Sequence, residues 1–161
     1  MAACVFDGAA RAAVHDLKYR RIRSRSEILA ELLADAVERR PIALDLLMPV
    51  PLAAGRRRER GFNQSEEIAT WLGGHIGVPV DAEALRRIRE TPPQVGRSGA
   101  ARRENVAGAF ACAPPEAASG KRIGLVDDVM TTGATLEACA DALKSCGAAR
   151  VYALVVTRAT S

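Results

Sequence analysis

The stretch from Ile123 to Leu136 constrains the fold more than any other part of this sequence of 161 residues. Four residues that are apolar or glycine, Ile-Gly-Leu-Val, lead directly into Asp127 and Asp128. A turn of threonine and glycine follows, and then a helical pattern begins. This order predicts a buried strand, a turn and a helix. In a parallel sheet, such a turn lies at the carboxyl edge of the strands, where α/β proteins bind their ligands.

The turn over residues 131–135 has the composition of a phosphate site. Its small residues allow the backbone to wrap closely around an oxyanion, and the N–H groups and the dipole of the next helix favour negative charge. Two carboxylates beside a phosphate repel it, but they can accept hydrogen bonds from adjacent hydroxyls of a sugar that carries the phosphate, with a divalent cation moderating the charge. The alternative is structural: an Asp-Asp pair can cap a helix, and Thr-Gly turns are common.

The rest of the sequence alternates apolar runs with helical patterns, without an internal repeat or a long linker. We expect helices over residues 7–19, 25–39, 63–76, 98–106 and 133–145, and strands over 44–50, 85–89, 121–127 and 151–156. Strands that alternate with helices predict an α/β fold with a parallel sheet. The size suits a single domain, which we expect over residues 1–161.

Composition excludes several classes of protein. The chain is 48% hydrophobic and 26% charged, and no run of 18 apolar residues predicts a membrane-spanning helix. The first residues lack the basic and apolar regions of a secretory signal, so we expect a cytoplasmic protein. The cysteines are too scattered for a zinc site or a disulfide framework, and we expect Cys139 and Cys146 to be buried thiols of a helix.

The net charge of +4 is unevenly distributed. Residues 56–60 carry +3 and residues 86–103 carry +5, so the remainder carries −4. We interpret both basic segments as loops. They indicate either an anion site, for the phosphates of a small ligand or of a nucleic acid, or simply a solvated surface rich in arginine.

Residues 127–135, Asp-Asp-Val-Met-Thr-Thr-Gly-Ala-Thr, resemble the phosphoribosyl pyrophosphate (PRPP) motif of type I phosphoribosyltransferases. Neither a P-loop nor a Gly-x-Gly-x-x-Gly motif is present. Further motifs narrow the resemblance to the ComF/GntX-like branch of that family, from about residue 14 to residue 158. They are Pro49–Leu52, Arg60–Gln64, Arg87–Gln94, Arg102–Val106 and Gly108–Phe110. Many ComF relatives begin with a cysteine zinc ribbon, which this sequence lacks, so we expect magnesium to be its only metal.

The resemblance implies a three-layer, Rossmann-like type I phosphoribosyltransferase fold and a role for each motif. Asp127 and Asp128 would be the catalytic pair, holding the ribose 2- and 3-hydroxyls and, indirectly, Mg²⁺. The 5-phosphate would lie against Met130, Thr131, Thr132, Gly133, Ala134 and Thr135. Pyrophosphate would contact Pro51, Leu52, Arg56, Arg57, Arg58 and Arg60. A flap would contribute Arg87, Arg89, Gln94 and Arg102.

The implied reaction is displacement of pyrophosphate at C1 of ribose by an unidentified acceptor. It requires charge neutralisation and exclusion of water rather than a nucleophilic side chain or a histidine base. We therefore expect His15 and His75, which lie outside every motif, to have structural or surface roles. We also expect Asn63 to cap a helix while Arg60 faces the site. Phe110 is expected to be structural, and the role of Asn105 is left open.

The alternative function is a PRPP-binding or DNA-uptake accessory protein without turnover. ComF-like proteins are associated with natural transformation, and the basic segments could contact single-stranded DNA. Aromatic residues make up only 4% of the chain, which argues against a platform for stacked bases. The acidic pair and the threonine turn favour PRPP binding under either hypothesis. The sequence leaves a homodimer open.

Overall fold

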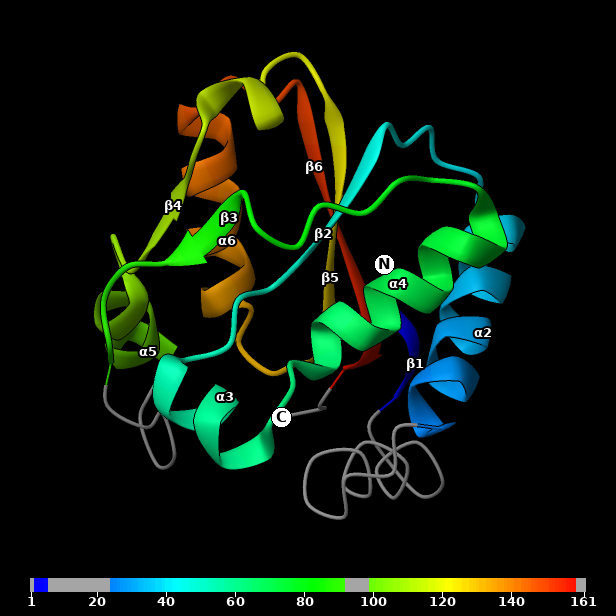
Figure 1. Cartoon of the computed structure of the whole chain (residues 1–161), viewed down its shortest axis with the longest axis horizontal. Coiled ribbons are helices and arrows are strands. Elements are labelled where there is room, and N and C mark those ends of the chain that lie inside the picture. The colour runs from blue at the N-terminus through cyan, green and yellow to red at the C-terminus, as the bar shows by residue number, and fades with distance from the viewer. Residues whose placement is uncertain (1, 6–23, 92–98, 159–161) are drawn as a thin grey trace.

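The computed structural model describes residues 2–5, 24–91 and 99–158, with side chains for 26–91 and 103–158. Its centre is a four-stranded sheet in the order β1-β6-β5-β2, and every neighbouring pair is parallel (Figure 1). The strands are β1 (Ala2–Val5), β2 (Leu46–Pro49), β5 (Arg122–Met130) and β6 (Arg150–Arg158). The carboxyl ends of β2 and β5 are adjacent, because Pro49 pairs with Val126.

Helices cover both faces of this sheet, as the sequence predicts. The helices α2 (Ser24–Arg39) and α4 (Gln64–Ile76) lie on one face, and α6 (Ala134–Ser145) lies on the other (Figure 1). Each helix begins and ends within a residue or two of its predicted bounds. The three layers confirm the expected α/β architecture.

Two hydrophobic cores fill the space between the layers. Alternate strand residues point to opposite faces, so Leu47 packs with the α2 and α4 side while Met48 packs with the α6 side. The same alternation separates Leu125 from Val126 on β5. Gly124 allows β5 to pack closely against Leu47 of β2, because a Cβ at this position would lie 2.6 Å from Leu47 Cδ2. These contacts fix β2 and β5 relative to the helices and so determine where their carboxyl ends lie.

A second sheet lies beside α6 and is antiparallel. It pairs β3 (Leu85–Arg87) with β4 (Phe110–Cys112), and α5 (Gly99–Val106) lies near it (Figure 1). A short 3₁₀ helix, η1 (Pro115–Ala117), follows β4. Phe110 is buried on β4, which agrees with the structural role expected for it. None of the helices in the described ranges is long and apolar enough to cross a membrane.

Several sequence expectations need correction. The basic segment 56–60 is not a loop but part of helix α3 (Ala54–Arg60), which has no buried residue and therefore no apolar periodicity to reveal it. β5 continues to Met130 rather than ending at residue 127, because its end stays paired with β6. The short strands β1 and β4 were not expected at all. The helix expected over residues 7–19 lies outside the described residues.

Candidate functional site

A cleft of about 410 Å³ opens at the carboxyl ends of β2 and β5. It brings together residues from four separate segments of the sequence. Its lining consists of Val50, Pro51, Leu52, Ala53, Gly55, Arg56, Arg60, Asn63, Gln64, Ser65, Arg87, Glu90, Thr91, Asp127, Asp128, Val129 and Thr135. Eight of these were predicted as site residues: Pro51, Leu52, Arg56, Arg60, Arg87, Asp127, Asp128 and Thr135.

A second, much smaller hollow of about 30 Å³ adjoins the cleft and shares Asp127, Val129 and Thr135 with it. Every residue predicted to hold a 5-phosphate lines this hollow, namely Met130, Thr131, Thr132, Gly133, Ala134 and Thr135. Gly133 has φ of 82°, a left-handed conformation that other residues rarely adopt, and it turns the chain from β5 into α6. The first N–H groups of α6 therefore border this hollow, where they favour negative charge.

Both acidic residues are fixed to neighbouring parts of the structure by hydrogen bonds. Asp128 is only 5% exposed, and its backbone carbonyl accepts a hydrogen bond of 3.3 Å from Thr157 Oγ1 on β6. Asp127 accepts two hydrogen bonds of 2.9 Å at the same oxygen, Oδ1, from Ser65 Oγ and from the backbone N–H of Asp128. Bonds from two elements restrict the orientation of this carboxylate far more than one would.

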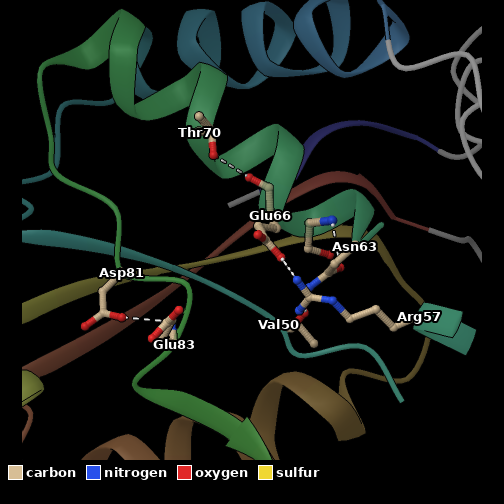
Figure 2. A network of polar contacts seen from close by, with 8 residues as sticks. Val50, Arg57, Asn63, Glu66, Thr70, Asp81 and Glu83 are labelled. Carbon is tan, nitrogen blue, oxygen red and sulfur yellow. Dashed lines mark hydrogen bonds and ion pairs between the residues drawn. The ribbon is translucent and has the colours of Figure 1, made fainter. Parts of the chain in front are cut away.

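The loop after β2 is fixed to the same strand and helix. The N–H of Val50 donates to Val126 O at 2.9 Å, and its carbonyl accepts a bond of 3.1 Å from Asn63 Nδ2 (Figure 2). Asn63 is also the N-cap of α4, because its Oδ1 accepts from the backbone N–H of Ser65. The expected cap is therefore confirmed, and Arg60 lines the cleft as expected.

The arginines of α3 point in different directions. Arg56 and Arg60 line the cleft. Arg57 instead extends to Glu66 of α4, with 3.2 Å between Nη2 and Oε2 (Figure 2). Arg58 is exposed and is not among the lining residues. Successive residues of a helix diverge by about 100°, so a helix cannot direct all four arginines to one anion.

The segment after β3 closes the other side of the cleft. Glu90 Oε1 accepts a bond of 3.0 Å from the N–H of Ala54 at the start of α3. Arg87 lies over the Phe110 ring, 5.4 Å from its centre, and donates to the hydroxyl of Thr91. Burial lowers the pKa of the Arg87 guanidinium, the nearby Glu90 opposes this shift, and Arg56 adds to it. Arg87 and Arg56 therefore repel each other, and a bound anion would reduce this repulsion.

The other predicted flap residues are not shown to face the cleft. Arg89 Nη2 donates to the carbonyls of Asn105 and Ala107, at 3.2 and 2.6 Å, so it fastens the end of α5 rather than lining the cavity. Asn105, whose role the sequence leaves open, takes part through its backbone. Gln94 lies outside the described residues, as does the side chain of Arg102.

Four polar lining residues were given no role at the site from the sequence, although all but Ser65 lie within the motifs of the resemblance: Gln64, Ser65, Glu90 and Thr91. Gln64 is 3% exposed, and its Oε1 has no hydrogen-bond partner among the described residues, so the cleft wall presents a buried acceptor. Ser65 lies two residues after the Asn63 cap, and that position beside a predicted site is the one signal that could have drawn attention to it.

The donor set fits magnesium better than a softer metal. Mg²⁺ prefers oxygen ligands and keeps several waters, taking one or two carboxylates together with phosphate oxygens. The site offers two adjacent carboxylates in the cleft, and Asp127 also borders the smaller hollow. Among the described residues there is no group of three or more His, Cys, Asp or Glu side chains that could hold an ion. An ion here would depend on the oxygens of a bound ligand, in keeping with the indirect role expected for the pair.

The sequence matches a known protein family over most of its length. The family model described as the phosphoribosyl transferase domain matches residues 22–161. The chain belongs to this family. It has the type I phosphoribosyltransferase fold, since it is similar to the glutamine PRPP amidotransferase structure from B. subtilis complexed with ADP and GMP. That similarity has a TM-score of 0.57 at 22% identity and covers 83% of this chain and 26% of the other.

Two relatives confirm the ComF-like resemblance. The DNA utilization protein YhgH of Salmonella typhi is 35% identical over 150 residues, which are 90% of this chain and 65% of the relative. The Competence protein F of Haemophilus influenzae is 30% identical over 139 residues, which are 85% of this chain and 61% of the relative. The chain thus spans less than two thirds of the length of these relatives.

Proposed function

We propose that this phosphoribosyltransferase-family chain binds PRPP with Mg²⁺ and transfers its phosphoribosyl group to a nitrogen acceptor. The observation that carries the proposal is the order of three sites along one sheet edge. The hollow over Met130–Thr135 is followed by Asp127 and Asp128, and the cleft with Arg56, Arg60 and Arg87 comes next. PRPP has its groups in this same order: a 5-phosphate, two ribose hydroxyls and a pyrophosphate.

Each end of PRPP would use a different part of the chain. The N–H groups around Gly133 would bind the 5-phosphate, while Asp127 and Asp128 would accept hydrogen bonds from the ribose hydroxyls. Pro51 and Leu52 would contact the pyrophosphate, and Arg56, Arg60 and Arg87 would face its charge. Magnesium, when bound, neutralises part of the pyrophosphate charge.

The reaction would break the bond between C1 of ribose and a pyrophosphate oxygen. The electron pair leaves with pyrophosphate, a bond forms between C1 and the acceptor nitrogen, and a proton of that nitrogen passes to solvent. The arginines stabilise the charge that develops on the leaving group. Carboxylates held beside the ring stabilise the positive charge of the oxocarbenium-like state. The chain would act in the cytoplasm, as the sequence predicts.

A second candidate is a PRPP-binding accessory protein in DNA uptake, without turnover. The names of the relatives, DNA utilization protein and Competence protein F, support this candidate. The positions of the arginines do not favour a DNA surface. Arg56, Arg60 and Arg87 all line the cleft, while Arg57 and Arg89 contact other parts of the chain.

The test is calorimetric titration of PRPP with and without Mg²⁺, followed by an assay of pyrophosphate release over a panel of nucleobases and small amines. We expect binding that requires Mg²⁺ and release that requires one class of acceptor. Binding without release across the whole panel would favour the accessory protein. Absence of PRPP binding in saturating Mg²⁺ would contradict both candidates.

A further inference from the structure

A closed ring of hydrogen bonds joins the two halves of the candidate site. It runs from Val126 of β5 to Val50, from Val50 to Asn63, from Asn63 to Ser65, and from Ser65 back to β5 at Asp127. The bonds are Val50 N–H to Val126 O at 2.9 Å, Asn63 Nδ2 to Val50 O at 3.1 Å, Ser65 N–H to Asn63 Oδ1 at 3.1 Å and Ser65 Oγ to Asp127 Oδ1 at 2.9 Å.

The ring is shielded from water on its helical side. Asn63 and Ser65 are each only 4% exposed, and Val50 is 6% exposed. Hydrogen bonds in a buried network strengthen one another, and breaking one leaves a buried polar group without its partner. The ring therefore holds its two ends at a defined separation.

The ring contains more than a helix cap requires. Capping needs only the bond from the Ser65 N–H to Asn63 Oδ1, and aspartate caps a helix as well as asparagine does. The Asn63 amide also donates to the loop after β2, and this donor is one that aspartate lacks. The Ser65 hydroxyl, for its part, reaches the carboxylate of Asp127, 62 residues away in the sequence.

We propose that Ser65 and Asn63 are positioning residues, which set the ribose carboxylate and the pyrophosphate loop at a fixed distance from each other. Ser65 orients Asp127, and Asn63 holds Val50 at the start of the loop that carries Pro51 and Leu52. This inference rests on the proposed function, in which Asp127 binds ribose and the loop binds pyrophosphate. It gives Asn63, within the segment Arg60–Gln64, and Ser65, directly after that segment, a role beyond capping helix α4.

The experiment compares two ligands that differ only in the pyrophosphate. Ribose 5-phosphate and PRPP are titrated by calorimetry, with Mg²⁺ present, against Ser65→Ala and Asn63→Asp. We expect Ser65→Ala to weaken the binding of both ligands by about three- to tenfold, because both carry the ribose hydroxyls. Asn63→Asp keeps the cap but loses the donor to Val50. We therefore expect it to weaken PRPP binding by a similar factor and to change the affinity for ribose 5-phosphate by no more than about twofold.

A control on the same helix tests for a merely structural effect. Thr70→Ala removes a hydroxyl that donates to Glu66 O at 2.9 Å, on α4 but away from the cleft (Figure 2). We expect it to leave both affinities unchanged. If Ser65→Ala unfolds below the assay temperature, Ser65→Cys keeps the size and a weaker donor, and we expect a smaller loss of both ligands.

Asp127→Ala separates the failure of this inference from the failure of the proposed function. In the Asp127→Ala background, Ser65→Ala is expected to cause no additional loss, because no carboxylate remains to be oriented. Undiminished ribose 5-phosphate binding by Asp127→Ala would refute the ribose assignment itself. If Asp127→Ala weakens that ligand while Ser65→Ala and Asn63→Asp change only the melting temperature, the positioning roles are wrong and the proposed function stands.

Discussion

The two sides of the cleft are stabilised in different ways. On the side of β5 and α4, Asp127 and Asp128 are held by hydrogen bonds to buried residues such as Ser65 and Thr157. On the side of α3, Arg56 is exposed and Arg60 is partly exposed. The first side is therefore fixed by buried contacts, whereas the second presents positive charge on exposed side chains.

The helices that carry the two sides show the same contrast. Six residues of α4 are buried and Asn63 caps it, whereas α3 has no buried residue and no side-chain hydrogen bond at its N-cap. The N-terminus of α3 is instead held by Glu90, 36 residues away and exposed. We infer that packing fixes the side with the carboxylates before a ligand arrives, and that the side with the arginines depends less on packing.

The largest effect expected from this difference is at the carboxylate pair. Asp127→Asn combined with Asp128→Asn should weaken PRPP by about a hundredfold, since each charge-assisted hydrogen bond contributes about 1.5–3 kcal/mol and 1.4 kcal/mol is tenfold. Calorimetry in the presence of Mg²⁺ measures the loss. The loss should change little with salt, because Asp128 is buried. Affinity equal to that of the unaltered protein would refute the ribose assignment.

A pair of glycine substitutions tests the contrast in packing. A Cβ on Gly73 of α4 would lie 2.7 Å from the backbone oxygen of Val78, while nothing lies within 4 Å of one on Gly55 of α3. We expect Gly73→Ala to lower the free energy of unfolding by about 1–3 kcal/mol. Gly55→Ala should raise it by about 0.5–1 kcal/mol, because alanine favours the helix. Urea denaturation of both variants provides the measurement, and equal effects would contradict the distinction.

The fold was largely predictable from the sequence because its core elements have strong patterns. The apolar runs of β2 and β5 and the helical spacing of α2 and α4 reflect burial, and burial determines which residues are selected. By contrast, α3 has no buried face and was mistaken for a loop. The short strands β3 and β4 occupy three residues each, and only β3 was expected.

The candidate site was predictable where residues adjacent in sequence act together. Asp127–Thr135 runs from the end of β5 through a short turn into α6, so the acidic pair and the residues of the hollow are neighbours in the structure as they are in the sequence. Ser65 and Glu90 reach the site from distant segments, and apart from the position of Ser65 near the Asn63 cap, nothing local distinguishes them from ordinary surface or helix residues. The same limit explains why Arg57 was grouped with Arg56, since only the helix shows that Arg57 extends to Glu66 instead.

The arginine side should give a smaller, salt-sensitive effect. Arg56→Gln with Arg60→Gln is expected to weaken PRPP by about three- to tenfold, since exposed charges contribute about 1 kcal/mol or less each. Ribose 5-phosphate should be nearly unaffected, and the PRPP loss should shrink in high salt. Arg58→Gln, on the same helix but outside the cleft lining, is the matched control. Equal losses for the two ligands would assign the arginines to another role.

The smallest effect on stability is expected at Asp45. This residue tests whether burial or the number of hydrogen bonds contributes more to the stability that a carboxylate provides. Asp45 accepts three bonds from Arg122, at 2.8, 2.9 and 2.6 Å, one more than the two described for Asp127, yet both partners are exposed. These hydrogen bonds hold the pKa of the Asp45 carboxyl well below its usual range. The unfolded chain has the ordinary value of about 3.9, so the stabilisation is fully present above about pH 5 and is lost as pH falls from there. Water and salt screen an exposed pair, so Asp45→Asn should change the melting temperature only slightly at pH 7, and by less still near pH 2, where most of the contribution of the pair has been lost. If Asp45→Asn lowered the stability at pH 7 as much as Gly73→Ala does, exposure would not explain why the two sides of the site differ in their stabilisation.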